Sequence, residues 1–269
     1  MTSNIESNAP PRYVFHHIPK CGGNSLLALL ALRFFPVDDY ARKGPGEMNH
    51  ESADSFRARR LNLDELDWES PQPPILTGHF ELPGCALFER YSETETPPYR
   101  RIVFLRDPLD RAISYFHYAR RSGRFPLRHE SLEAFLASLD NPMARLIAPN
   151  PKHALGALAK YWFVGTLETA ALDLRRLAPL LGLEAKTMPH ANRTSRPNIF
   201  LADSVFDEFK SRNSLDYQLW RTARDWSLAG GLERRRELGW RLPWFNEEER
   251  IRFCQPSSSS SARNGRITI

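Results

Sequence analysis

A glycine-containing loop between an apolar strand and an apolar helix is the feature that most constrains the fold of this chain. Residues 13–18 form an apolar run that predicts a buried strand, and residues 25–35 have the spacing of a helix. Backbone amides at the start of a helix attract anions, and neighbouring glycines let the ligand approach the backbone closely. The usual phosphate-loop spacing G-x-x-x-x-G-K-[ST] is absent, because Lys20 precedes the two glycines.

The loop itself supplies the first candidate ligands of an anion. Lys20 stands at the end of the strand, where its ammonium would lie beside a bound phosphate ester. The helix dipole would add positive potential. Taken alone, the segment is equally compatible with a tight turn that carries an ordinary surface lysine. The other loop residues that we expect around the anion are Cys21, Gly22, Gly23, Asn24 and Ser25.

A second segment, residues 100–120, has the same strand-then-helix order. Arg106 ends an apolar run, and Pro108 fits the first turn of a helix, where a backbone N–H is not needed. Ser114 follows two turns into that helix. Arg106 and Ser114 could hold one phosphate through a charged fork and a hydroxyl. The alternative is an Arg-Asp pair that only caps the helix.

The rest of the chain continues to alternate between strands and helices. This order predicts an α/β fold, a single P-loop-type domain with a central parallel sheet flanked by helices. Further strands are expected at 75–77 and 101–105. Helices are expected at 110–121, 132–139, 153–161, 168–181 and 215–228.

Composition agrees with one globular domain. The 269 residues are 41% hydrophobic and 26% charged, enough to bury a sizeable core. We expect a flexible N-terminus at 1–11, one domain at 12–255 and a disordered tail at 256–269, where five consecutive serines stand. The sequence shows no signal peptide or membrane-spanning run, which predicts a cytoplasmic location.

Charge and cysteine content limit the classes of partner. The net charge of +5 and the isoelectric point near 9.2 favour anionic ligands without naming one. Basic residues gather at 57–60, 120–124 and 234–236, where a solvated surface is the ordinary interpretation. Cys21, Cys85 and Cys254 lack the spacing of a zinc site or a disulfide scaffold, which favours free thiols.

Together the two strand-loop-helix segments resemble a known family. The sequence HIPKCGGNS resembles the 5′-phosphosulfate loop of sulfotransferases that use 3′-phosphoadenosine 5′-phosphosulfate (PAPS), and FLRDPxxRxxS resembles their 3′-phosphate segment. The resemblance is greatest to the branch of the heparan sulfate 2-O- and 6-O-sulfotransferases and their bacterial relatives. Cys21 and Asn24 depart from the threonines usual in this loop, so backbone contacts are expected there rather than hydroxyl contacts.

Weaker segments agree with that branch. The sequence 77–80, TGHF, resembles the element that supplies a histidine base, which makes His79 the candidate catalytic base beside Lys20. The segments 164–168 and 213–220 resemble a strand and a late helix of the same branch. In the segment 189–195, which resembles a loop near the nucleotide, the implied cofactor contacts are Asn192, Arg193 and Ser195.

The resemblance implies transfer of a sulfuryl group from PAPS to an acceptor hydroxyl, with adenosine 3′,5′-bisphosphate as product. It also implies a carbohydrate acceptor, no metal and no nucleic-acid partner. A P-loop nucleotide or small-molecule kinase is the alternative, although it would need a hydroxyl residue after the lysine and an aspartate for Mg²⁺. A third interpretation is a non-catalytic binder of anionic polysaccharide or nucleic acid.

Overall fold

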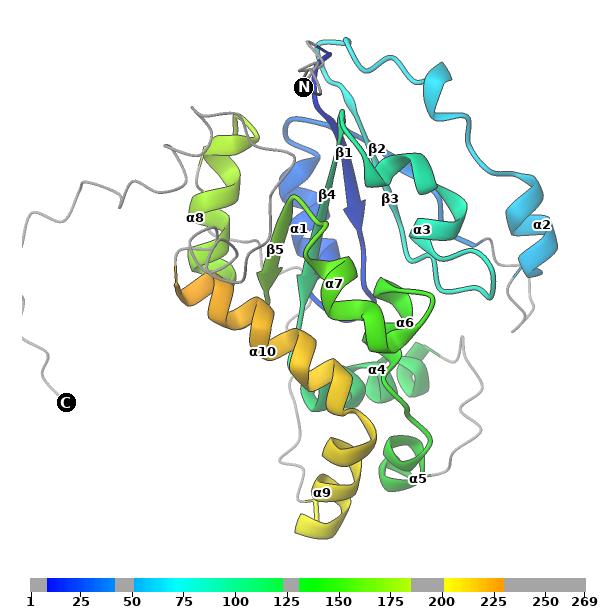
Figure 1. The fold of residues 1–269 in the computed structure, drawn as a ribbon, viewed down its shortest axis with the longest axis vertical. Helices are drawn as coiled ribbons and strands as arrows, with labels where there is room; N and C mark the ends of the chain where they lie inside the picture. The colour runs from blue at the N-terminus through cyan, green and yellow to red at the C-terminus, as the bar shows by residue number, and fades with distance from the viewer. Residues whose placement is uncertain (1–8, 42–50, 123–130, 185–200, 230–269) are drawn as a thin grey trace, which may run out of the picture.

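The computed structural model describes residues 9–41, 51–122, 131–184 and 201–229 (Figure 1). Its centre is a five-stranded sheet in the order β2-β3-β1-β4-β5, in which every pairing is parallel. The sheet confirms the predicted α/β class with a central parallel sheet. The strands are β1 (Arg12–His16), β2 (Phe35–Asp38), β3 (Pro74–Gly78), β4 (Tyr99–Leu105) and β5 (Phe163–Thr166).

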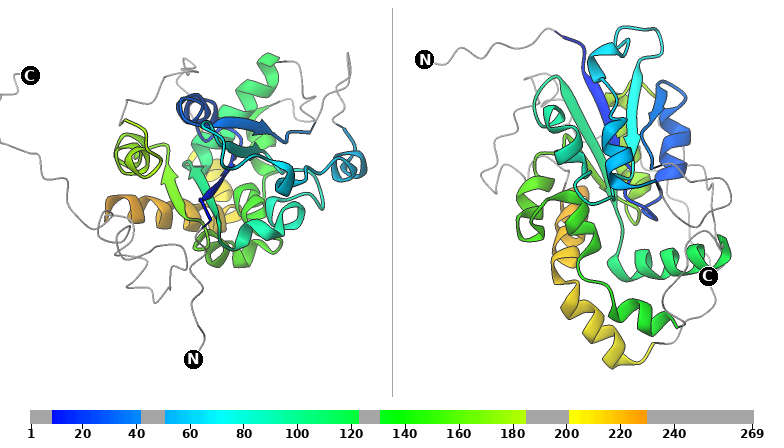
Figure 2. Two further views of the ribbon diagram at one scale, coloured as in Figure 1. Left: turned by 90° about the horizontal axis from the view of Figure 1, so that it is seen from above. Right: turned by 90° about the vertical axis from the view of Figure 1, so that its right-hand side faces the viewer.

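Helices cover both faces of this sheet and its carboxyl edge. Helices α1 and α8 cover one face, whereas α3, α6, α7 and α10 cover the other, and α4, α5 and α9 lie beyond the carboxyl ends of the strands (Figures 1 and 2). Their bounds are α1 Gly23–Leu30, α2 Ala53–Ala58, α3 Leu87–Arg90, α4 Pro108–Ser122, α5 Leu132–Ala137, α6 Pro142–Ile147, α7 Ala154–Leu158, α8 Ala170–Leu180, α9 Asp203–Arg212 and α10 Ser214–Leu228, with 3-10 turns at Leu63–Glu65, Ser92–Glu95 and Pro151–His153.

The two faces of β1 bury different side chains because residues alternate along a strand. Tyr13 and Phe15 pack with the leucines of α1 and α8. Val14 and His16 point to the opposite face, where Val14 joins the core beneath α3. Every residue of β1 after Arg12 is buried, as expected for a central strand of a parallel sheet.

The topology brings the ends of the central strands together. The chain runs from β1 out to β2, returns through β3, and then crosses to β4 on the other side of β1. His16 is in register with Gly78 of β3 and with Val103 of β4. The segments that follow these three strands therefore meet at one edge, where open α/β sheets bind their ligands.

Several elements differ from the sequence-based expectation. The helix expected at 25–35 ends at Leu30, and residues Phe35–Asp38 form the edge strand β2, which was not predicted. The predicted helix 153–161 is a 3-10 turn followed by the short α7. The short helices α2, α3 and α6 and the longer α9 were also not predicted. Residues 1–8 and 230–269, including the predicted tail, lie outside the described residues.

None of the helices in the described ranges is both long and apolar enough to cross a lipid bilayer. The cytoplasmic location stays a prediction.

Candidate functional site

The loop after β1 turns sharply into α1 through two residues with positive φ. Lys20 has φ 70°, and Gly22, the residue before α1, has φ 82° in the left-handed region. A glycine accepts this conformation without a steric penalty, whereas Lys20 does so against the preference of an L-residue. The Gly22 carbonyl accepts from the amides of Ser25 at 3.1 Å and Leu26 at 3.2 Å. The turn thereby starts the helix.

The predicted backbone contacts around an anion divide into two groups. The amide of Cys21 donates to the Ile18 carbonyl at 3.3 Å, and the amide of Ser25 to Gly22, so these two are already engaged. The amides of Gly22, Gly23 and Asn24 have no acceptor within the described part of the chain. These three N–H groups are the donors that the loop offers a ligand.

The side chain of Cys21 turns away from the loop. It is 2% exposed and packs in the core with Ile18, Val103 and Leu105. Burial raises the pKa of its thiol to about 12, so the sulfur stays protonated. Any ligand contact of Cys21 is therefore limited to its backbone.

Two buried arginines from the β4–α4 segment hold the loop. Arg106 Nη1 donates to the Lys20 carbonyl, and Arg111 Nε donates to the Pro19 carbonyl, both at 3.1 Å. Arg106 Nη2 lies 3.7 Å from a carboxylate oxygen of Asp110. Arg106 Nε is buried and has no hydrogen-bond partner in the described part of the chain. Arg106 thus anchors the loop and keeps one donor that no described residue satisfies.

One face of helix α4 lies against the Lys20 side chain. The Lys20 ammonium lies over the Tyr118 ring, 4.2 Å from its centroid. Burial, followed by the nearby charges of Arg106 and Arg121, lowers the pKa of Lys20. Ser114 is half-buried and precedes Tyr118 by four residues, so the two share a helix face. Several cations thus surround the loop, a field that favours an anionic ligand.

His79 follows β3 directly and lies beside this loop. Its ring packs edge-to-face with those of His17 and Tyr40, at centroid distances of 4.6 and 4.7 Å. Nδ1 lies 3.7 Å from a carboxylate oxygen of Glu81, and the side chain is partly exposed. A carboxylate near Nδ1 favours the tautomer whose Nε2 can accept a proton. The position suits a general base at the edge of the sheet.

His17 supports the loop from beneath. A Cβ atom placed on Gly23 would lie 1.9 Å from His17 Cδ2 and 2.0 Å from Nε2. Only glycine leaves room for the imidazole at this point. His17 Nδ1 shares a hydrogen bond of 2.8 Å with the Tyr40 hydroxyl, which in turn lies 3.2 Å from Thr77 Oγ1. Burial lowers the pKa of His17 to about 3, so the ring is neutral.

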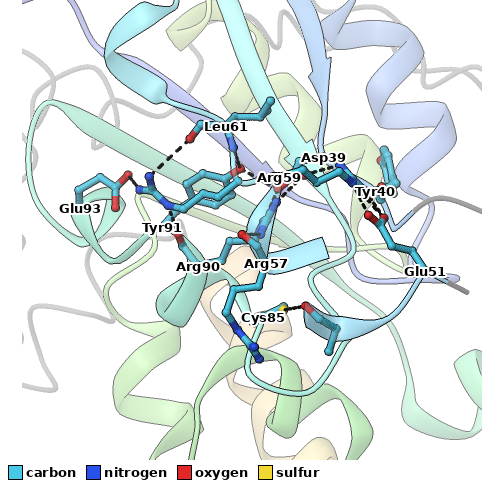
Figure 3. A network of polar contacts seen from close by, with 12 residues as sticks. Asp39, Tyr40, Glu51, Arg57, Arg59, Leu61, Cys85, Arg90, Tyr91 and Glu93 are labelled. Atoms are coloured by element: carbon cyan, nitrogen blue, oxygen red, sulfur yellow. Dashed lines mark hydrogen bonds and ion pairs between the residues drawn. The ribbon is translucent and has the colours of Figure 1, made fainter. Parts of the chain in front are cut away.

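Asp39, at the end of β2, is the centre of a buried network that the sequence did not reveal (Figure 3). Its carboxylate accepts from Arg90 Nε at 2.6 Å, from the Tyr91 hydroxyl at 2.7 Å and from Arg59 Nη1 at 3.3 Å. Arg59 also donates to the Tyr40 carbonyl at 2.5 Å. The network fixes Tyr40, and through it His17. Arg59, from the basic cluster 57–60, is therefore part of the scaffold.

The carboxylate of Glu168, which follows β5, connects the segment between β4 and α4 to helix α10. Glu168 Oε1 accepts from the Asp107 amide at 2.9 Å, and Oε2 from Trp220 Nε1 at 3.0 Å. Asp107 Oδ1 accepts from the Asp110 amide at 3.0 Å and so caps α4. The predicted contacts Asn192, Arg193 and Ser195 lie outside the described residues.

The helix spacing of α4 could have revealed residues that the sequence-based reasoning missed. Arg111, Tyr118 and Arg121 stand three residues before, four after and seven after Ser114, which places them on one face. Tyr40 had no such signal, because the strand before it was not recognised. Among the described residues no group of three or more His, Cys, Asp or Glu side chains could hold a metal ion.

The comparisons with known proteins add little to this geometry. No protein-family model matches the chain, and a search of curated proteins finds no match. A similar solved structure is the sulfotransferase from Alicyclobacillus acidocaldarius, with a TM-score of 0.46 and 17% identity over 80% of this chain and 95% of that chain. A match at this level does not establish a shared activity, so the function has to be inferred from the residues of the site.

Proposed function

We propose that this chain is a PAPS-dependent O-sulfotransferase. The observation that carries the proposal is the arrangement at the carboxyl edge of the sheet. Three loop amides and Arg106 Nε have no partner among the described residues, the Lys20 ammonium lies at the same loop, and His79 lies beside it. Donors and positive charge suit a phosphosulfate, and a partly exposed imidazole suits removal of a hydroxyl proton.

The chain's residues fit such a nucleotide. The amides of Gly22, Gly23 and Asn24 and the ammonium of Lys20 would hold the 5′-phosphosulfate, while Arg106 Nε and the Ser114 hydroxyl would hold the 3′-phosphate. A buried guanidinium nitrogen without a partner is costly, and a phosphate oxygen would satisfy it. When bound, PAPS supplies the sulfuryl group that is transferred.

The catalytic roles are part of the same proposal. His79 takes the proton of the acceptor hydroxyl through Nε2, and Glu81 near Nδ1 stabilises the imidazolium that forms. Lys20 stabilises the negative charge that develops on the bridging oxygen of the leaving group. Arg106 and Arg111 keep the loop in place through its carbonyls.

The kinase alternative has weaker support at the same edge. The aspartate that would have to hold Mg²⁺ is Asp107, whose Oδ1 caps α4. Burial raises the pKa of Asp107, which disfavours the charged form that a magnesium ligand needs. Lys20 is followed by Cys21, whose side chain is buried in the core. The absence of a metal requirement and of a nucleic-acid partner stays a prediction.

The acceptor is a compound with a free hydroxyl group. The resemblance to the heparan sulfate branch suggests a carbohydrate, and membership of that branch stays a prediction. Loops that bind acceptors vary most within a fold, so the acceptor class must be judged from the walls of this chain's own site.

Nucleotide binding is the first test. Adenosine 3′,5′-bisphosphate in EDTA should raise the melting temperature, with a stabilisation of about 2.7 kcal/mol at about 100 times its dissociation constant. A shift with ATP-Mg²⁺ and none with adenosine 3′,5′-bisphosphate would instead support a kinase. Heparin is the third ligand in the same series, and a shift with heparin alone would support a polysaccharide binder.

Catalysis by His79 is the second test. His79→Ala should keep the affinity for adenosine 3′,5′-bisphosphate, because the imidazole meets the acceptor, but should lower sulfuryl transfer from PAPS by roughly 10²- to 10⁴-fold. His153→Ala is the matched control, since His153 is an exposed histidine ahead of α7. Normal turnover by His79→Ala would remove the histidine base from the proposal.

A further inference from the structure

A cavity of about 480 Å³ opens beside the residues that follow His79, and neither the sequence nor the proposed nucleotide contacts account for it. It lies between the segment 80–89, the first turns of α4, and helices α5 and α6. Its volume falls in the range of sites for small organic molecules. Two of its lining residues, Phe80 and Glu81, directly follow His79 in the chain.

The polar lining residues at the His79 end connect the cavity to the catalytic groups. Glu81 lines the cavity and lies 3.7 Å from His79 Nδ1. Arg111 lines it as well, and its Nε donates to the Pro19 carbonyl of the nucleotide loop. Tyr115 lines the cavity too, and burial, followed by the negative charge of Glu81, raises the pKa of its hydroxyl. A hydroxyl bound at this end would be near both the base and the loop.

The remaining walls are apolar and partly aromatic. They include Leu82, Phe88, Phe135, Leu139 and Leu146. Aromatic and aliphatic walls favour a flat or branched apolar body over one that carries polar groups along its length.

Among the described lining residues, the two charged side chains on these walls already have partners. Glu89 accepts from the Ala86 amide at 3.0 Å, and Arg145 pairs with Asp140 on the surface. A sugar carries hydroxyls around its whole ring, and each one buried against such walls without a hydrogen bond is costly. The lining therefore disfavours the carbohydrate that the family resemblance suggests.

We infer that the acceptor of this enzyme is an apolar alcohol or phenol, bound in the cavity with its single hydroxyl toward Glu81 and His79. The inference rests on the proposed sulfotransferase function. In the reaction the acceptor oxygen forms a bond to sulfur, the bond from sulfur to the bridging oxygen breaks with its electron pair leaving on adenosine 3′,5′-bisphosphate, and the hydroxyl proton passes to His79.

Binding and turnover of chosen probes test the inference. Calorimetry with the whole chain saturated with adenosine 3′,5′-bisphosphate should show binding of 2-naphthol and of 1-octanol, and no binding of a non-sulfated glucosamine–uronic acid disaccharide. With PAPS, the bound probes should be sulfated and the disaccharide should not. The comparison of 2-naphthol with 1-octanol distinguishes a phenol from an aliphatic alcohol, and either result supports an apolar acceptor.

A pair of variants tests whether 2-naphthol binds in this cavity. Leu146→Trp fills part of the cavity and should weaken binding of 2-naphthol by roughly tenfold or more, the effect seen when an apolar pocket no longer fits its ligand. Leu32→Trp is the control, because Leu32 is 61% exposed and lies just after α1, away from the cavity lining. Both variants should keep their affinity for adenosine 3′,5′-bisphosphate, which shows that they are folded.

The outcomes separate this inference from the proposed function. If adenosine 3′,5′-bisphosphate binds and the disaccharide is sulfated while the apolar probes are not, the acceptor class is wrong and the sulfotransferase proposal stands. Equal loss of 2-naphthol affinity in Leu146→Trp and Leu32→Trp, or none in either, would place the acceptor elsewhere and overturn the assignment of this cavity. Failure of adenosine 3′,5′-bisphosphate to bind the parent chain would overturn both.

Discussion

The contact between Gly23 and His17 allows a quantitative test of how the loop is built. In Gly23→Ala the added methyl would have to occupy the space of the His17 ring, 1.9 Å from Cδ2 and 2.7 Å from Cγ. His17 is 6% exposed and its imidazole is hydrogen-bonded to Tyr40, so the ring can move only by leaving its packed position. Gly23 has no positive φ, so backbone conformation does not oppose the substitution.

The expected magnitude combines three effects. Overpacking of a buried site costs about 1–3 kcal/mol, and loss of the hydrogen bond between His17 and Tyr40 costs roughly another 1 kcal/mol. The higher helix propensity of alanine returns at most about 1 kcal/mol. Gly23→Ala should therefore lower the free energy of unfolding by roughly 1–3 kcal/mol.

Urea unfolding followed by tryptophan fluorescence measures this loss. Gly156→Ala is the matched control, because no atom of the described residues lies within 4 Å of a Cβ at that position in α7. It should be neutral or stabilising by up to about 1 kcal/mol. In a His17→Ala background the clash is absent, so Gly23→Ala should cost almost nothing there. The same cost for Gly23→Ala in both backgrounds would refute the proposed contact.

Three further predictions concern other parts of the site. Arg106→Ala should weaken binding of adenosine 3′,5′-bisphosphate more than that of adenosine 5′-phosphosulfate, measured by calorimetry, whereas equal losses would indicate only the loop anchor. Burial lowers the pKa of His16 and His17 to about 3, below the roughly 6.5 of a histidine in the unfolded chain. The free energy of unfolding should therefore fall as the pH drops from about 6.5 toward 3, by at most ~1.4 kcal/mol per pH unit for each ring. Urea titrations at several pH values would show this slope, and His16→Asn should reduce it. Asp39→Ala should cost about 3–5 kcal/mol in the same unfolding assay, because it leaves the buried Arg90 guanidinium without its partner carboxylate.

The parts of the site that the sequence predicted are those formed by neighbouring residues in the chain. The strand, loop and helix around Lys20 and the strand before Arg106 follow from local hydrophobic period and glycine placement. The structure adds that Arg106 anchors the loop carbonyl of Lys20, a contact between residues 86 positions apart. No local pattern contains such a contact, so the sequence offered for Arg106 only a ligand contact or a helix-capping Arg-Asp pair.

The scaffold behind His79 was not predicted for a related reason. Strand β2 has four residues and contains a proline, so the sequence pattern that would identify it as a strand is weak. Without β2, Asp39 and Tyr40 belonged to no predicted element. Their partners Arg90 and His17 lie 51 and 23 residues away. Only the folded sheet brings these groups to one edge, and the proposed acceptor cavity depends in the same way on α5 and α6.

The loop is held from two sides by groups that do not need the nucleotide. On the side of α4, Arg106 and Arg111 bind two successive loop carbonyls. On the side of the sheet, the neutral His17 ring fills the space beneath Gly23 and is fixed by Tyr40. A loop fixed in this way loses little conformational entropy when a ligand binds, which leaves more of the contact energy for affinity. The loop amides that find no acceptor among the described residues therefore point to a binding site formed in advance of its ligand.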